Sequence, residues 1–165
     1  MSIARFTRVS QARYEKDLLS LGEKAPAAAL PLSEIPLPRR ATAGSAGYDF
    51  VCPLETTLPP EGEALIPTGI RAEMEEGWVL LLFPRSSLGF RHGLRLANTV
   101  GVIDSDYAFA DNEGHILVKL RNPQKTPVTL GRGDRFCQGV FVPCGTAEEE
   151  EPPQVRKGGF GSTGR

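Results

Sequence analysis

The sequence predicts an all-β domain with one short helix before it, because turn-forming residues divide most of the chain into short apolar runs. The 165 residues include 14 prolines and 18 glycines, which are spread along the chain. Strand-like runs lie between them, at residues 63–66, 78–83, 115–120 and 136–142. Short strands at this spacing, each bounded by turn residues, are typical of a β-sandwich or a jelly roll.

The run at residues 78–83, Trp-Val-Leu-Leu-Leu-Phe, is apolar at every position. A strand with one face in water alternates apolar and polar side chains, and this run does not alternate. We therefore expect both of its faces to be buried, either in the core or at a contact between subunits.

The N-terminal part of the chain predicts a helix over residues 11–21, after a short basic end in solvent. Ser10 is a favoured N-cap residue, and Gly22 is placed to end the helix. One side of this helix carries three apolar side chains, Tyr14, Leu18 and Leu21. Residues 23–38 are rich in alanine and proline without any period, which favours an extended connection on the surface.

Composition limits the classes of partner. A length of 165 residues suits one domain, and a formal net charge of -1 gives no field that attracts nucleic acid or an anionic membrane. No apolar run approaches the roughly 20 residues that cross a bilayer. Cys52, Cys137 and Cys144 are odd in number and lack metal-ligand spacing, so we expect buried free thiols and a cytoplasmic protein.

The segment Arg85-Ser86-Ser87-Leu88-Gly89 has the components of a phosphate-binding turn. It offers a guanidinium, two hydroxyls and the backbone N–H groups of small residues. The sequence contains no GxxxxGK[ST] motif, so this is not a P-loop. The structural alternative is a capped turn that leads into a short helix, since serine is a favoured cap.

Residues 101–107, Gly-Val-Ile-Asp-Ser-Asp-Tyr, place two carboxylates beside β-branched residues that favour a strand. An ionised carboxylate is costly to bury without a partner, so Asp104 is either an ordinary turn residue or a functional group. In the functional interpretation Asp104 orients a water molecule in line with a phosphorus atom and takes its proton. Asp106 is interpreted as structural.

Five segments, in this order and spacing, resemble the motifs of the trimeric dUTP diphosphatases (dUTPases). They are residues 46–49, 84–89, 96–107, 133–138 and 158–164. The resemblance implies a distorted jelly-roll β-barrel with a flexible C-terminal arm, assembled as a homotrimer with sites at the subunit interfaces. It divides the chain into an N-terminal helix and connection (1–36), a β-domain (37–147) and an acidic linker with the arm (148–165).

The implied reaction is hydrolysis of dUTP to dUMP and diphosphate with Mg²⁺, which limits uracil in DNA and supplies dUMP for dTMP synthesis. Asp104 is the catalytic base. Asp49 matches an aspartate that acts through metal-bound water or a basic partner. The ion itself prefers phosphate oxygens and retained water to a cage of protein ligands.

The substrate-binding residues that the resemblance implies are Arg85, Ser86, Ser87, Gly89, Asn98, Gly101, Val102, Ile103, Tyr107, Gln138, Arg156, Phe160, Gly161 and Ser162. The serines, the turn amides, Arg85 and Gln138 contact phosphates. Asn98 and the backbone of a β-hairpin around Gly101 recognise uracil. The ring of Tyr107 leaves no room for a 2'-hydroxyl. In the arm, Phe160 stacks on the base and Arg156 approaches phosphates.

The chain departs from the family pattern in two places. A longer loop, residues 108–113, follows Tyr107, and the fifth motif is about one residue shorter, which leaves open whether Arg156 or Lys157 is the cation of the arm. Two alternatives share the fold, a nucleotide-sensing or regulatory dUTPase-like protein and a dCTP deaminase-type enzyme. Asp104, Tyr107 and the complete final motif favour the dUTPase.

Overall fold

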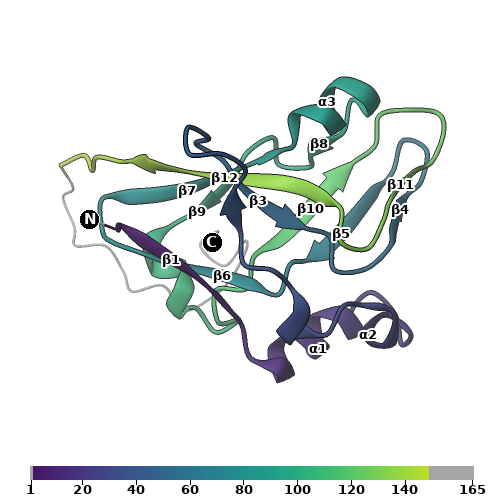
Figure 1. Cartoon of the computed structure of the whole chain (residues 1–165), viewed down its shortest axis with the longest axis horizontal. Coiled ribbons are helices and arrows are strands. Elements are labelled where there is room, and N and C mark those ends of the chain that lie inside the picture. Colours follow the sequence, from purple (N-terminus) through teal and green to yellow (C-terminus); the bar gives the residue numbers. More distant parts are fainter. Residues whose placement is uncertain (1, 149–165) are drawn as a thin grey trace.

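The computed structural model describes residues 2–148, in which the paired strands run antiparallel (Figure 1). The largest sheet has five strands in the order β2-β3-β12-β7-β9. Their bounds are Arg39–Arg40 (β2), Tyr48–Val51 (β3), Arg135–Pro143 (β12), Trp78–Pro84 (β7) and Gly101–Ile103 (β9). Strand β12 pairs with the full length of β7, so these two strands form the centre of the sheet.

Three smaller sheets complete the β-structure of the described residues. They are β5 (Glu63–Pro67) with β10 (Leu117–Arg121) and β8 (Arg95–Leu96), β1 (Ala4–Arg8) with β6 (Ile70–Met74), and β4 (Thr56–Leu58) with β11 (Val128–Leu130). The predicted β-rich fold is confirmed. Within residues 2–148, however, the four sheets do not close into one continuous barrel.

Strand β7 shows how the sheet meets the core. Leu80 and Leu82 are buried, whereas Val79 and Leu81 between them are only half-buried. Because successive side chains of a strand point to opposite faces, one face of β7 lies in the core and the other is partly open in the single chain. The expected burial of the core face is therefore confirmed. Burial of the second face against another subunit stays a prediction.

The N-terminal end is a strand, not the solvated end that the basic composition predicted. Strand β1 pairs with β6 in a register that sets Arg5 opposite Glu73, and their side chains form an ion pair of 2.6 Å. Phe6 packs against the rings of Tyr48, Phe50 and Phe141, with centroids 5.4 to 5.6 Å away. The arginines thus lie toward solvent, and one aromatic side chain anchors the strand. The domain boundaries near residues 36 and 147 stay predictions.

Helix α1 spans Gln11–Leu19 and ends before the predicted residue 21. Ser10 is its N-cap, because the Ser10 hydroxyl accepts a hydrogen bond from the Arg13 amide at 3.1 Å. Tyr14 and Leu18 are buried as predicted, but Leu21 is 38% exposed. Leu21 lies beyond the last helical turn, and Gly22 adopts a φ of 138° that turns the chain away.

The segment 23–38 is not the extended connection that its composition predicted. It contains the short helix α2 (Ala25–Ala28) and the 3₁₀ turn η1 (Leu32–Glu34). Pro26 fits the first turn of α2, where the amide hydrogen that it lacks would have no partner. Ile35 is 1% exposed, so the segment is anchored in the core. Figure 1 shows α1 and α2 side by side at one edge of the β-domain.

The three cysteines are free, and two match the prediction of buried thiols. Cys52 and Cys137 are buried in the core, whereas Cys144 is exposed, because it follows β12 where the chain leaves the sheet. Among residues 2–148 we find no helix with the length and apolar character needed to cross a membrane.

Candidate active site

Residues from three of the predicted motifs line one cavity of about 380 Å³ beside β3, β12 and the end of β7 in the five-stranded sheet. Asp49 comes from β3, Gln138 from β12, and Arg85 and Ser86 follow the end of β7. The sheet brings these residues together because Gln138 pairs with Asp49 on one side and with Phe83 on the other. The cavity thus combines a guanidinium, a hydroxyl and an amide, which are groups that bind phosphate.

Asp49 lies between two guanidinium groups. Its Oδ1 is 3.3 Å from Nε of Arg85, and its Oδ2 accepts a hydrogen bond of 3.1 Å from Nη1 of Arg135. The Asp49 side chain is only 11% exposed, so these contacts hold Arg85 and Arg135 in fixed positions. Of the two roles left open for Asp49, the contact to a basic partner is present in the structure.

Arg135 was not singled out by the sequence, although it lies inside the fourth motif. A β-bulge between Arg135 and Cys137 places Arg135 opposite Val51, while Gln138 stays opposite Asp49. Without the bulge, Arg135 would lie opposite the residue after Val51, and its side chain would point to the other face of the sheet from Asp49. Arg135 also lines a neighbouring cavity of about 540 Å³ together with Arg39, Arg40 and Asp49. The bulge therefore extends the positive surface beside Asp49.

Gln138 is held against the backbone of the first motif. Its Nε2 donates to the carbonyl of Pro84 at 3.4 Å, and its Oε1 faces Gly47. A Cβ atom on Gly47 would lie 2.4 Å from that oxygen, closer than non-bonded atoms approach. The glycine of the first motif therefore leaves space for the Gln138 amide.

Ser86, Ser87 and Gly89 belong to helix α3 (Ser86–His92), whose first residues follow Arg85. The structural alternative of a turn leading into a short helix is present here, but the serine cap is wrong, because Arg85 occupies the N-cap position and no side chain caps the helix. Ser86 and Ser87 are exposed, and Ser86 lines the cavity.

Asn98 and Gly101 line a different cavity, of about 420 Å³, beside Leu82 and Leu96. The chain folds back as a β-hairpin before Gly101 and not around it, because Leu96 and Thr99 form an antiparallel bridge across residues 97–98. The turn comes earlier, where the Thr99 amide donates to the carbonyl of Leu96 and Thr99 has a φ of 68°. Strand β9 then pairs with β7, with Gly101 opposite Leu82 and Ile103 opposite Leu80.

The other residues of the third motif, in and after strand β9, differ in how far they are buried. Ile103 is 1% exposed and packs into the core, whereas Val102 is 52% exposed. Asp104 follows the strand, is half-buried, and precedes the 3₁₀ helix η2 (Ser105–Phe109). Tyr107 within η2 is 3% exposed, and its amide donates to the carbonyl of Asp104 at 3.1 Å.

The two groups of site residues are separated along β7. Ile103 pairs with Leu80, so Asp104 lies toward Val79 near the start of β7, whereas Arg85 follows the end of the strand. At roughly 3.3 Å per residue, about 20 Å separate these two positions. One chain therefore does not bring Asp104 to the cavity that holds Arg85, Ser86 and Gln138. The predicted arm residues Arg156, Phe160, Gly161 and Ser162 lie outside the described residues.

The cavity of this β-rich chain has the groups of a protein that binds phosphate-containing ligands. Comparison with known proteins gives the particular family. A family model described as dUTPase matches residues 33–164. The chain belongs to the dUTPase family, as the five motifs indicated.

Relatives support this assignment over most of the chain. A "Deoxyuridine 5'-triphosphate nucleotidohydrolase" of Lactococcus lactis subsp. lactis is 44% identical over 133 residues, which cover 79% of this chain and 89% of the relative. A protein of the same name from Shewanella oneidensis is 42% identical over 140 residues, covering 80% and 89%. These names favour the dUTPase over the deaminase and sensor alternatives.

Solved structures agree on the fold. The crystal structure of a dUTPase from Streptococcus mutans is 44% identical, has a TM-score of 0.64, and covers 68% of this chain and 89% of its own. A Staphylococcus bacteriophage 80alpha dUTPase is only 18% identical, yet its TM-score is 0.67 and it covers 93% and 98%. The jelly-roll-like β-fold implied by the resemblance is thus confirmed.

Proposed function

We propose that this protein hydrolyses dUTP to dUMP and diphosphate in the cytoplasm, which limits uracil in DNA and supplies dUMP. One observation carries the proposal, namely the cavity in which Asp49 orients Arg85 beside Ser86 and Gln138. A triphosphate needs fixed positive charge and hydrogen-bond donors, and these residues supply both without a Walker motif. The free thiols of Cys52 and Cys137 fit a reducing compartment.

Mg²⁺ fits this site only as an ion held mainly by the substrate. Among residues 2–148 no three His, Cys, Asp or Glu side chains come together as metal ligands. The phosphates and water would provide most of the ligands, as Mg²⁺ prefers, and Asp49 would contact the ion through water. When bound, the ion neutralises charge on the phosphate oxygens.

Asp104 acts as the base that orients the attacking water and accepts its proton. No covalent intermediate is needed, because the oxygen of water attacks a phosphorus atom directly. The P–O bond between the dUMP part and the diphosphate part then breaks, and the two products leave. Because Asp104 and Arg85 are far apart in one chain, the complete site joins Asp104 of one subunit to the phosphate cavity of another. This arrangement requires an oligomer, which we propose to be the homotrimer of the family.

Selection of the nucleotide depends on the third motif. Asn98 and the backbone near Gly101 would recognise the uracil edge, and cytosine would leave buried polar groups unpaired there. The ring of Tyr107 would lie against the sugar and exclude a 2'-hydroxyl. Ser87 and Gly89 would contact phosphates, and the arm residues Arg156 and Phe160 would cover the bound nucleotide.

The test is diphosphate release from dUTP, dCTP, dTTP and UTP by the wild type and by Asp104→Asn. The variant keeps the size of the side chain but lacks the base, so kcat for dUTP should fall by roughly 10²-fold or more while KM stays within about threefold. Asp106→Asn, two residues further along, is the matched control and should keep most of the activity. Undiminished turnover by Asp104→Asn would show that another group is the base.

A further inference from the structure

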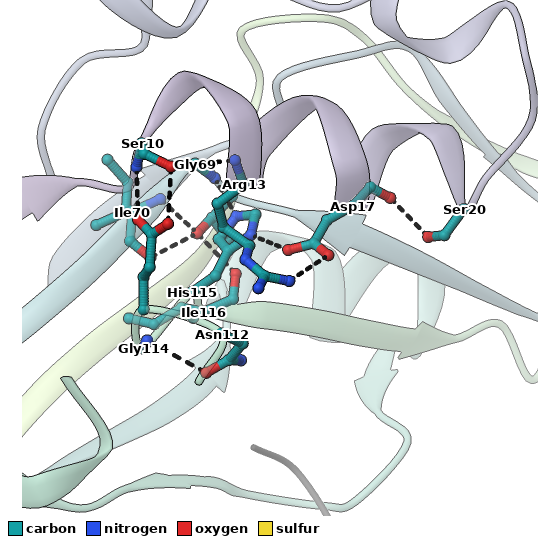
Figure 2. Close-up of polar contacts among 12 residues, drawn as sticks. Ser10, Arg13, Asp17, Ser20, Gly69, Ile70, Asn112, Gly114, His115 and Ile116 are labelled. Carbon is teal, nitrogen blue, oxygen red and sulfur yellow. Dashed lines mark hydrogen bonds and ion pairs between the residues drawn. The ribbon is translucent and has the colours of Figure 1, made fainter. Parts of the chain in front are cut away.

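Helix α1 contacts the loop that follows Tyr107, although the two are far apart in the sequence (Figure 2). The backbone amide and the hydroxyl of Ser10 donate to the two carboxylate oxygens of Glu113, at 2.8 and 2.7 Å. Nη2 of Arg13 donates to the carbonyl of Asp111 at 3.0 Å. The family model matches residues 33–164, so α1 lies before the matched part of the chain.

The loop that α1 holds has an unusual backbone. Glu113 has a φ of 59°, in the left-handed region that non-glycine residues rarely adopt. Gly114 follows with a φ of 68°, and a Cβ atom there would lie 2.5 Å from the Cα of Ala108. A sharp turn of this kind persists where surrounding contacts hold it, and the two Ser10 bonds to Glu113 provide such contacts.

The same loop fixes the hydroxyl of Tyr107. This hydroxyl donates to the carbonyl of His115 at 2.9 Å and accepts a hydrogen bond from Nδ2 of Asn112 at 2.7 Å. Oδ1 of Asn112 in turn accepts from the Gly114 amide at 3.2 Å. The phenol is therefore anchored at its far end, and the ring cannot tilt without breaking these bonds.

His115 connects the loop back to α1. Its side chain is fully buried, and its Nε2 accepts a hydrogen bond of 2.8 Å from the Gly69 amide. The proton of the neutral ring is therefore on Nδ1, which lies 2.6 Å from Oδ2 of Asp17 and donates to it. Asp17 is also 3.5 Å from Nη1 of Arg13. Figure 2 shows Asp17, Arg13 and His115 together beneath the helix.

We propose that Asn112 is a positioning residue for sugar selection, and that helix α1 supports it through the loop 108–114. The hydrogen bond from Asn112 sets the angle of the Tyr107 ring, and the contacts of Ser10 and Asp17 keep the loop in place. This inference rests on the proposed function, in which the Tyr107 ring excludes a 2'-hydroxyl. A ring held at its hydroxyl end excludes the extra oxygen more strictly than one that can tilt.

The measured quantity is the ratio of kcat/KM for dUTP to kcat/KM for UTP. Both values come from the same preparation, so any loss of folded enzyme cancels and a merely structural defect leaves the ratio unchanged. Asn112→Ala and Tyr107→Phe each remove one partner of the hydrogen bond, and each should lower the ratio by about three- to tenfold. The double variant should lower it no further than Tyr107→Phe alone, since Asn112 acts on the ring only through the hydroxyl that Tyr107→Phe removes.

The helix is tested in the same assay. Asp17→Ala should lower the ratio by about two- to fivefold, and Asp17→Asn should restore most of it, because the asparagine oxygen accepts the same bond from His115. Glu15→Ala is the matched control on α1, since Glu15 is bonded there to Gln11 and not to the loop. An unchanged ratio in both Asp17 variants would show that helix α1 does not support sugar selection.

Tyr107→Ala separates sugar selection by the ring from the positioning role of Asn112. If Tyr107→Ala lowers the ratio and Asn112→Ala leaves it within twofold of the wild type, the positioning role is wrong and the sugar account stands. If Tyr107→Ala itself leaves the ratio unchanged, the ring does not select the sugar. Neither the proposed role of Tyr107 nor the positioning role of Asn112 then holds.

Discussion

Asp104 and Arg85 lie toward opposite ends of strand β7, so the proposed base and the phosphate cavity belong to different parts of one subunit. In the proposed function, a site that needs both residues is assembled between subunits. Subunits that lack Arg85 should therefore complement subunits that lack Asp104.

The test mixes Arg85→Ala and Asp104→Asn subunits in equal amounts and allows them to exchange. In a random mixture about three quarters of the trimers are mixed, and each should hold one intact site in three, which gives about one quarter of the wild-type activity. Each parent alone is the control, and native mass spectrometry checks the mixing. Mixed trimers as inactive as the parents would place the whole site within one subunit.

Asp49→Asn tests the orientation of the two arginines. The variant loses the charge that holds Arg85 and Arg135, so kcat/KM for dUTP should fall by about tenfold or more, while the melting temperature changes little, since partly exposed ion pairs add about 1 kcal/mol or less. Glu73→Gln is the matched control, because Glu73 also contacts two arginines, Arg5 and Arg71. Equal losses of activity in both variants would contradict a specific role for Asp49.

Gly47→Ala tests the space that the first motif leaves for Gln138. The added methyl group would lie 2.4 Å from Oε1 of Gln138, and that flexible amide would move away at small cost to stability. We expect kcat/KM for dUTP to fall by roughly tenfold with a nearly unchanged melting temperature. Gly44→Ala is the control in the same loop, since a Cβ atom on Gly44 meets no atom within 4 Å. The interpretation fails if Gly47→Ala retains full activity.

The stability of the protein should depend on pH through His115. Burial lowers the pKa of His115 below its ordinary value of 6.5, more than the neighbouring Asp17 carboxylate raises it. The unfolded chain then binds a proton near pH 6.5 that the folded protein does not bind. The stabilisation is complete above that pH and is lost as the pH falls below it.

Urea unfolding of the wild type between pH 8 and pH 5 measures this slope. This pH range lies above the one in which Glu113 changes the free energy of unfolding, because hydrogen bonds from Ser10 lower the pKa of Glu113 from 4.5. His115→Asn should be less stable at pH 8 but should flatten the pH dependence of the free energy of unfolding. His92→Asn, which removes the histidine of α3, is the control. A variant at His115 with the wild-type slope would assign the dependence to other groups.

Features that depend on local chemistry could be predicted from the residues alone. The spacing of glycine and proline predicted short strands, Ser10 was recognisable as an N-cap, and the order of the five motifs identified the family and most of the candidate site. These features follow from neighbours along the chain, where propensity and spacing act directly.

Contacts between residues far apart in the chain became known from the folded structure. The β-bulge turned Arg135 toward Asp49, a pairing with β6 made a strand of residues 4–8, and the fold brought Asp17 to His115. A bulge shifts a side chain to the other face without a mark in its own sequence, and a contact between remote residues depends on all the packing between them. The separation of Asp104 from Arg85 was hidden for the same reason, because it depends on the register of β9 against β7.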